Sequence, residues 1–203
     1  MANGKVITGF SKPYVALYSA NGGSPTYTDG QILARGVSAS LEATSGDPTT
    51  FYADNVIAES VGGVFTGASL KLVVDGLKDA ARKLIMGLPT ATSETINGNS
   101  VSIYEYDDRQ SIPYVGIGMI VRYMEAGVTS YVPVVFTKCA FSVDGMSANT
   151  QEETIAFQTQ ELTATVMRDD SSNHRWRRVV AEQSTEAAAE NIIRSLLNIS
   201  GTI

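Results

Sequence analysis

The sequence predicts a single domain, residues 1–203, that is mostly β, with antiparallel strands and two helices. Apolar and polar residues alternate along much of residues 100–168, and Tyr, Val, Ile, Phe and Thr, which are typical of strands, are frequent there. Two other segments, near residues 77–86 and 185–198, have the spacing of an amphipathic helix. A chain of 203 residues suffices for one well-buried core and is short for two domains.

The first half of the chain contains three predicted strands. Residues 13–18 are expected to form the first, followed by a loop over the Asn-, Gly- and Ser-rich residues 19–30. Residues 32–42 and 64–75 alternate between apolar and polar side chains, which is typical of half-buried strands.

The connection between the last two of these strands, residues 43–60, is polar but contains Phe51 and Tyr52. Loops longer than about 12 residues in compact domains are usually functional or disordered, and aromatic residues are unusual where a loop faces only water. We therefore predict an interaction arm here. The alternative is a hairpin packed on its own domain.

The helix expected over residues 77–86 ends at Gly87 and should cover an open face of the sheet. Further strands are predicted at residues 101–107, 114–124, 129–137, 140–144 and 153–168, with a hairpin turn at residues 125–127. Pro133 cannot donate to a ladder, so its strand is expected at an edge or with a bulge. The C-terminal helical segment, residues 184–198, should have Ser184 as its N-cap.

Composition excludes several classes of function. A net charge of −6 argues against a protein that grips nucleic acid, because that affinity comes from Lys and Arg neutralising phosphates. No apolar run approaches the roughly 20 residues that span a bilayer, so no membrane partner is expected. Residues 1–9 lack the apolar segment of a secretory signal, and we expect the chain to fold in a cytoplasm.

Residue types that carry chemistry are scattered along the chain. The only histidine, His174, and the only cysteine, Cys139, have no metal-ligand spacing, and Cys139 is expected to be a small buried hydrophobe. Residues 62–69 are similar to a phosphate-binding loop but carry Ala68 where that motif needs lysine. Gly116 and Gly118 are interpreted as two small residues on one face of a strand. We predict no catalytic residue, no metal site and no cofactor.

Acidic pairs are what a hydrolase would need, and three occur, at residues 107–108, 152–153 and 169–170. All three flank predicted strands, where Asp and Glu are explained by turn formation and solubility. The chain is therefore predicted not to be an enzyme.

The segment Arg175-Trp176-Arg177-Arg178 has two interpretations. It could stack on and clamp a single-stranded nucleic acid. In an acidic protein we prefer an inward Trp176, with the arginines paired to carboxylates of this or a neighbouring subunit. The residues of these candidate salt bridges between subunits are Arg175, Arg177, Arg178, Asp169 and Asp170.

Five stretches carry a resemblance to a known family. They read FSKPYVALY, TTFYADN, GASLKLVVDGL, IPYVGIGMIVRYMEAGVTSYV and TIAFQTQELTATVMRDD, and together they run through most of the chain. With them the sequence resembles the major tail proteins of bacteriophages with long non-contractile tails, in particular the phi13-like tail tube family. Residues 173–203 carry no part of this resemblance.

The resemblance implies an antiparallel β-sandwich or barrel-like tail tube fold with a flanking α-helix. It implies hexameric rings that stack into the tail tube of the virion, built in the bacterial host cytoplasm. Implied partners are further copies of the chain, the tape-measure protein, the tail terminator and the baseplate initiator, while genomic DNA passes without specific binding. The loop at residues 43–60 would reach an adjacent ring, with contacts expected at Phe51, Tyr52, Asp54 and Asn55.

Physical reasoning leads in the same direction. Several long strands on one domain leave exposed edges, and a head-to-tail contact between such edges closes a ring or extends a filament. An acidic lining would keep DNA from sticking to the channel, and the candidate lumen carboxylates are Glu105, Asp107 and Asp108. The alternative function is a β-sandwich module that binds a sugar or a host receptor.

Overall fold

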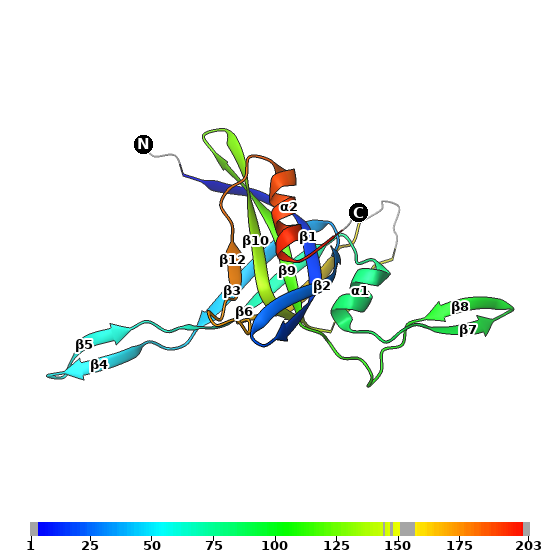
Figure 1. Cartoon of the computed structure of the whole chain (residues 1–203), viewed down its shortest axis with the longest axis horizontal. Helices are drawn as coiled ribbons and strands as arrows, with labels where there is room; N and C mark the ends of the chain where they lie inside the picture. The colour runs from blue at the N-terminus through cyan, green and yellow to red at the C-terminus, as the bar shows by residue number, and fades with distance from the viewer. Residues whose placement is uncertain (1–3, 144, 147, 151–156, 201–203) are drawn as a thin grey trace.

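One antiparallel sheet forms the body of the protein in the computed structural model (Figure 1). The structure describes residues 4–143, 145–146, 148–150 and 157–200. The strands of the sheet are β1 (Val6–Asn21), β2 (Ser24–Ile32), β3 (Gly36–Ser45), β6 (Phe65–Val74), β9 (Val115–Glu125), β10 (Val128–Phe141), β11 (Gln160–Met167) and β12 (Arg177–Val179). They follow the order β2-β1-β9-β10-β11-β6-β3, and β12 pairs with β10. With helices α1 (Asp79–Met86) and α2 (Glu186–Leu196), this confirms the predicted mostly-β fold with a flanking and a C-terminal helix.

The larger of two clusters of buried hydrophobic residues lies on the sheet face opposite α2. Alternate residues of β6, from Ala68 through Leu70 and Leu72 to Val74, are buried, as their pattern predicts. Helix α1 adds Ala81, Ile85 and Met86 to the same cluster and ends at Gly87, whose φ of 59° is the left-handed conformation that glycine accepts readily.

A second cluster joins α2 to the opposite face of the sheet. Ala189, Ile193 and Leu197 of the helical segment pack on residues of β1, β9 and β10. The contact is close because Gly116 and Gly118 face the helix: a Cβ atom at Gly118 would lie 2.4 Å from Ile193 Cγ2. The prediction of two small residues on one strand face is confirmed, and their purpose is to admit this helix.

Helix α2 begins one residue later than expected. Thr185, not Ser184, is the N-cap, and its side chain accepts a hydrogen bond from the Ala188 N–H at 3.2 Å. Glu190 ties the helix to β1, because Tyr14 donates a hydrogen bond to its carboxylate at 2.5 Å and Lys12 forms an ion pair with it. Burial alone would raise the pKa of Glu190, but these two partners outweigh it and hold that pKa below its usual value.

The predicted loop at residues 19–30 is wrong. Strand β1 continues to Asn21, turns at Gly22 and Gly23, which both have positive φ, and returns as β2. Only Tyr27 is buried along β2, so the strand is held mainly by its ladder to β1 and carries little hydrophobic alternation.

The prediction for Pro133 is also wrong. Residues 129–137 and 140–144 were separated in the prediction, whereas residues 128–141 form one central strand, β10. Proline is tolerated there because its neighbour on one side is only the short β12 segment, from which the Val180 N–H donates to the Pro133 carbonyl at 2.9 Å. The start of the predicted strand 153–168 lies outside the described residues, and β11 begins at Gln160.

Candidate assembly site

The predicted arm is a hairpin that leaves the body between β3 and β6. Its strands β4 (Thr49–Ala53) and β5 (Val56–Val61) project along the long axis of the molecule (Figure 1). Every residue of both strands is exposed, including Phe51 at 64% and Tyr52 at 60%. The alternative of a hairpin packed on its own domain therefore does not describe this segment. Its role in contacts between subunits stays a prediction.

Local backbone preferences explain how the arm forms. Asp54 and Asn55 both have positive φ, 50° and 64°, and make the two-residue turn at its tip. At its base the chain crosses itself at Gly46 and Gly63, where a Cβ on Gly63 would lie 1.6 Å from the Gly46 carbonyl oxygen. The Gly46 N–H donates to the Val64 carbonyl at 2.9 Å, which closes the base. The predicted contact residues Asp54 and Asn55 thus shape the turn.

The arm carries apolar side chains on both faces. Phe51 is directly opposite Glu59, and after a bulge Tyr52 is opposite Ile57, so the two aromatic residues lie on different faces. A two-stranded hairpin has little stability in water by itself, and exposed apolar patches mark interaction sites. These exposed apolar side chains make the arm a candidate contact surface.

A second hairpin projects at the other end of the long axis (Figure 1). Its second strand overlaps the predicted strand at residues 101–107, whereas its first strand and its turn were not predicted. Its strands are β7 (Thr92–Ile96) and β8 (Asn99–Ile103), joined by Asn97 and Gly98 in the positive-φ conformation. An Asn-Gly dipeptide between two short runs was the available signal. This hairpin is mostly Ser, Thr and Asn, and the Ser93 and Ser100 hydroxyls bond across it at 2.8 Å.

The candidate lumen carboxylates lie in the loop that follows β8. Glu105 was expected on a strand at residues 101–107, but β8 ends at Ile103. Arg109 pairs with Asp107 at 2.5 Å and with Glu105 at 3.1 Å, and its hydrogen bond lowers the pKa of Asp107. Asp108 is exposed beside them. The loop keeps a negative balance, and its place in a channel stays a prediction.

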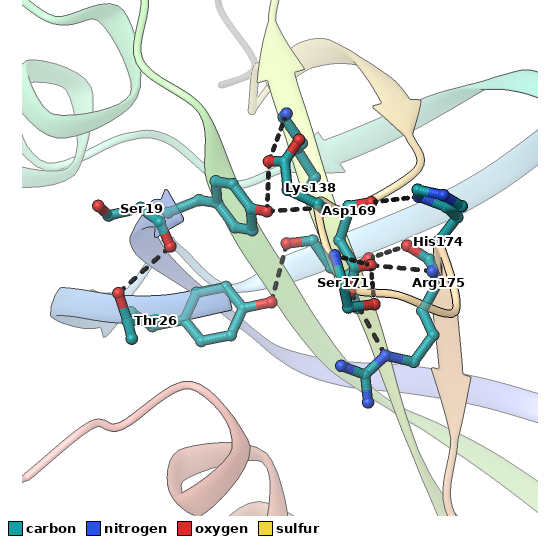
Figure 2. Close-up of polar contacts among 11 residues, drawn as sticks. Ser19, Thr26, Lys138, Asp169, Ser171, His174 and Arg175 are labelled. Carbon is teal, nitrogen blue, oxygen red and sulfur yellow. Dashed lines mark hydrogen bonds and ion pairs between the residues drawn. The ribbon is translucent and has the colours of Figure 1, made fainter. Parts of the chain in front are cut away.

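Both carboxylates suggested for salt bridges between subunits are bonded within the chain, and Figure 2 shows the contacts of Asp169. Asp169 is only 2% exposed and accepts hydrogen bonds from the backbone N–H groups of Ser171 at 3.1 Å and Arg175 at 2.9 Å. The Arg175 guanidinium lies 3.5 Å from its second oxygen. Asp170 bonds to Lys138 at 2.8 Å and to the Tyr18 hydroxyl at 2.7 Å. Burial and this bond raise the pKa of Tyr18 to about 12.

The arginine and tryptophan segment supports the interpretation with an inward aromatic ring. Trp176 stacks on Phe65 with ring centres 4.2 Å apart and planes at 5°. Arg177 lies over the Trp176 ring at 4.7 Å and is otherwise exposed on β12. Arg178 lines a small cavity of about 260 Å³ together with Asp169 and Arg175.

The other residues considered for catalysis or metal binding do not come together in one site within the described part of the chain. There, no group of three or more His, Cys, Asp or Glu side chains is placed to hold a metal. Cys139 is fully buried, as predicted, and burial raises the pKa of its thiol. The glycine-rich residues 62–69 run into strand β6, and the acidic pair at residues 152–153 lies outside the described residues. Neither described helix is long and apolar enough to cross a bilayer.

An apolar groove of about 560 Å³ opens on the sheet face opposite α2. Alternate residues of β9 and β10, such as Val121 and Val132, form its floor, and β1 and β3 form its walls. Among the described strands, β3 pairs only with β6, and residues 6–11 of β1 pair only with β9. The two unpaired edges converge where the Phe10 ring packs against Gly36.

No protein-family model matches the chain, and no curated protein matches its sequence.

Proposed function

We propose that this protein is a structural, non-enzymatic subunit that assembles with copies of itself into the tail tube of a bacteriophage. In this proposal, hexameric rings stack into a tube in the host cytoplasm, and the tube of the virion conducts genomic DNA without binding it. The tape-measure protein, tail terminator and baseplate initiator are the proposed partners. The ring size and these partners come from the resemblance of the sequence to tail tube proteins.

The observation that carries the proposal is the exposed apolar arm. A free subunit holds Phe51, Tyr52 and Ile57 in water on a hairpin that has no core. Burying an aromatic or large aliphatic side chain is worth roughly 1.5–3 kcal/mol, so a matching surface on another copy would gain several kcal/mol per arm. The unpaired edges of β3 and of residues 6–11 supply further backbone groups for association.

Electron microscopy of the purified protein tests the proposal. Concentrated protein is expected to form rings or tubes. Replacing residues 47–62 by Asn-Gly should keep the fold, because the Gly46 and Gly63 backbones already touch, and should abolish stacking.

A point variant separates the arm from general surface hydrophobicity. Phe51→Ser should prevent tubes, whereas Val128→Ser, which removes a residue of similar exposure (71%, against 64% for Phe51) at the start of β10, should not. Single particles at every concentration would overturn the proposal and favour a monomeric binding module.

A further inference from the structure

We infer that the groove between β1 and β3 is the receptor for the β4–β5 arm of a second copy of this chain. The inference rests on the proposed self-assembly and adds the surface that receives the arm. The groove is an apolar hollow, and the arm is a projecting hairpin with exposed apolar side chains (Figure 1).

The groove has the composition of a contact surface. Its floor is the alternating apolar face of β9 and β10, and its rim carries exposed Ile7, Val37 and Val179. Large exposed side chains around an apolar hollow mark a place where a partner excludes water. The wall formed by β3 is in addition an unpaired strand edge, to which an extended segment can add as a further strand.

The arm of the same chain cannot occupy this groove. The last β3 residue that lines the groove is Leu41, and the arm leaves β3 only after Ser45. From there the hairpin runs outward from the body (Figure 1). An occupant with the chemistry of the arm must therefore come from another copy.

Charge complementarity favours the same occupant. Glu59 lies opposite Phe51, so a carboxylate accompanies the aromatic ring on one face of the arm. Arg177 lines the groove and is exposed beside the apolar floor. Seating Phe51 in the groove would bring Glu59 to the side where a guanidinium is present.

The geometry of the contact also accounts for a polymer. Arm and groove are different surfaces of one chain, so the contact is head-to-tail and leaves a free arm and a free groove at the ends. Such a contact propagates into rings or filaments and does not stop at a dimer.

Charge reversal tests the pairing. Glu59→Arg and Arg177→Glu should each raise the protein concentration needed for assembly at least tenfold in light scattering, and the double variant should recover most of that loss. Assembly that neither single change affects, or a double variant no better than the singles, would overturn the inference. Wild-type protein that never assembles would instead refute the proposed function, so the two failures are distinguishable.

Cross-linking keeps the inference testable if Arg177→Glu disturbs the Trp176 contact. The native thiol of Cys139 is buried, so introduced cysteines can be read separately. Ala53→Cys lies on the Phe51 face of the arm, and Val37→Cys lies on the groove rim. Mixing these two variants under mild oxidation should give mixed disulfides at least tenfold above a mixture of Ala53→Cys with Val128→Cys. Equal yields from the two mixtures would mean that the arm does not seat at this groove.

Discussion

Gly118→Ala tests the packing of α2 on the sheet. The new Cβ would lie 2.4 Å from Ile193 Cγ2 and 3.1 Å from Leu197 Cδ1, where carbon atoms normally keep 3.5–4.0 Å. Ile193 is fully buried, and its Cγ2 is bonded directly to its Cβ, so it cannot move without a rotamer change or a shift of the helix. The substitution therefore overpacks the contact.

The expected loss of stability follows from two opposing effects. Overpacking of a core costs about 1–3 kcal/mol, while replacing glycine at an allowed backbone conformation returns about 0.4–1 kcal/mol. The net expectation is a loss of stability of about 1–2 kcal/mol, which lowers the midpoint of thermal unfolding by roughly 2–8 °C for a chain of this length. Urea unfolding followed by the fluorescence of the single tryptophan, Trp176, measures the free energy below the assembly concentration.

Two further variants make the result specific. Gly9→Ala is the matched control, because a Cβ there meets nothing within 4 Å, and it should leave stability unchanged or slightly higher. Adding Ile193→Ala to Gly118→Ala removes the clashing methyl group, so the double variant should lose about 1 kcal/mol less than the sum of the single losses. A Gly118→Ala protein as stable as the Gly9→Ala control, or strictly additive losses, would refute the packing argument.

The remaining predictions concern the partly buried Glu190 and the buried Cys139. Because the partners of Glu190 hold its pKa below the unfolded value, its contribution to stability is present above about pH 4.3 and is lost as pH falls through the lower folded-state pKa. Glu190→Gln should cost about 1–2 kcal/mol at pH 7, and urea midpoints of the two proteins should converge below pH 4; a constant difference would contradict this account. Cys139 should resist a thiol reagent in the native protein at pH 8 and react at once in 6 M guanidinium, since burial raises the pKa of its thiol. Rapid native labelling would show that this region opens.

The elements that the sequence predicted best are those with one fully buried face. Strand β6 alternates over residues 68–74 without interruption, and α1 combines helical spacing with the stop at Gly87. In these segments buried positions carry apolar residues and most exposed positions carry polar ones. The periodicity of the sequence is therefore enough to predict the element.

The missed elements are strands with little or no buried face. β2 buries only Tyr27, and β7 leaves every side chain in water, so neither shows alternation. β8 is exposed except at the half-buried Ile103, and the predicted strand at residues 101–107 overlaps it only in part. Backbone ladders and positive-φ turns at Gly22 and Gly98 hold them. Their composition of Ser, Thr, Asn and Gly is that of a loop, and only the turn dipeptides distinguish the two.

Part of the candidate site was also predictable from the residue types. Phe51 and Tyr52 in a polar connection indicated an arm, because aromatic side chains in water require a partner. The ion pair of Arg175 with Asp169 lies within the chain, which was one of the two predicted possibilities. The bond between Asp170 and Tyr18 was not predictable, because Tyr18 arrives from β1, far away in the sequence.

Folding and the proposed assembly depend on separate segments of this chain. The two buried clusters lie on the two faces of the main sheet and include no residue of β4 or β5. Gly46 and Gly63 close the base of the arm with backbone contacts alone, so no arm side chain is needed to complete the core. Substitutions in the arm are therefore expected to change the proposed affinity between copies at little cost to the stability of each copy. Under the proposed function, Phe51, which is exposed in the single subunit, would be kept because its partner surface lies on the next subunit.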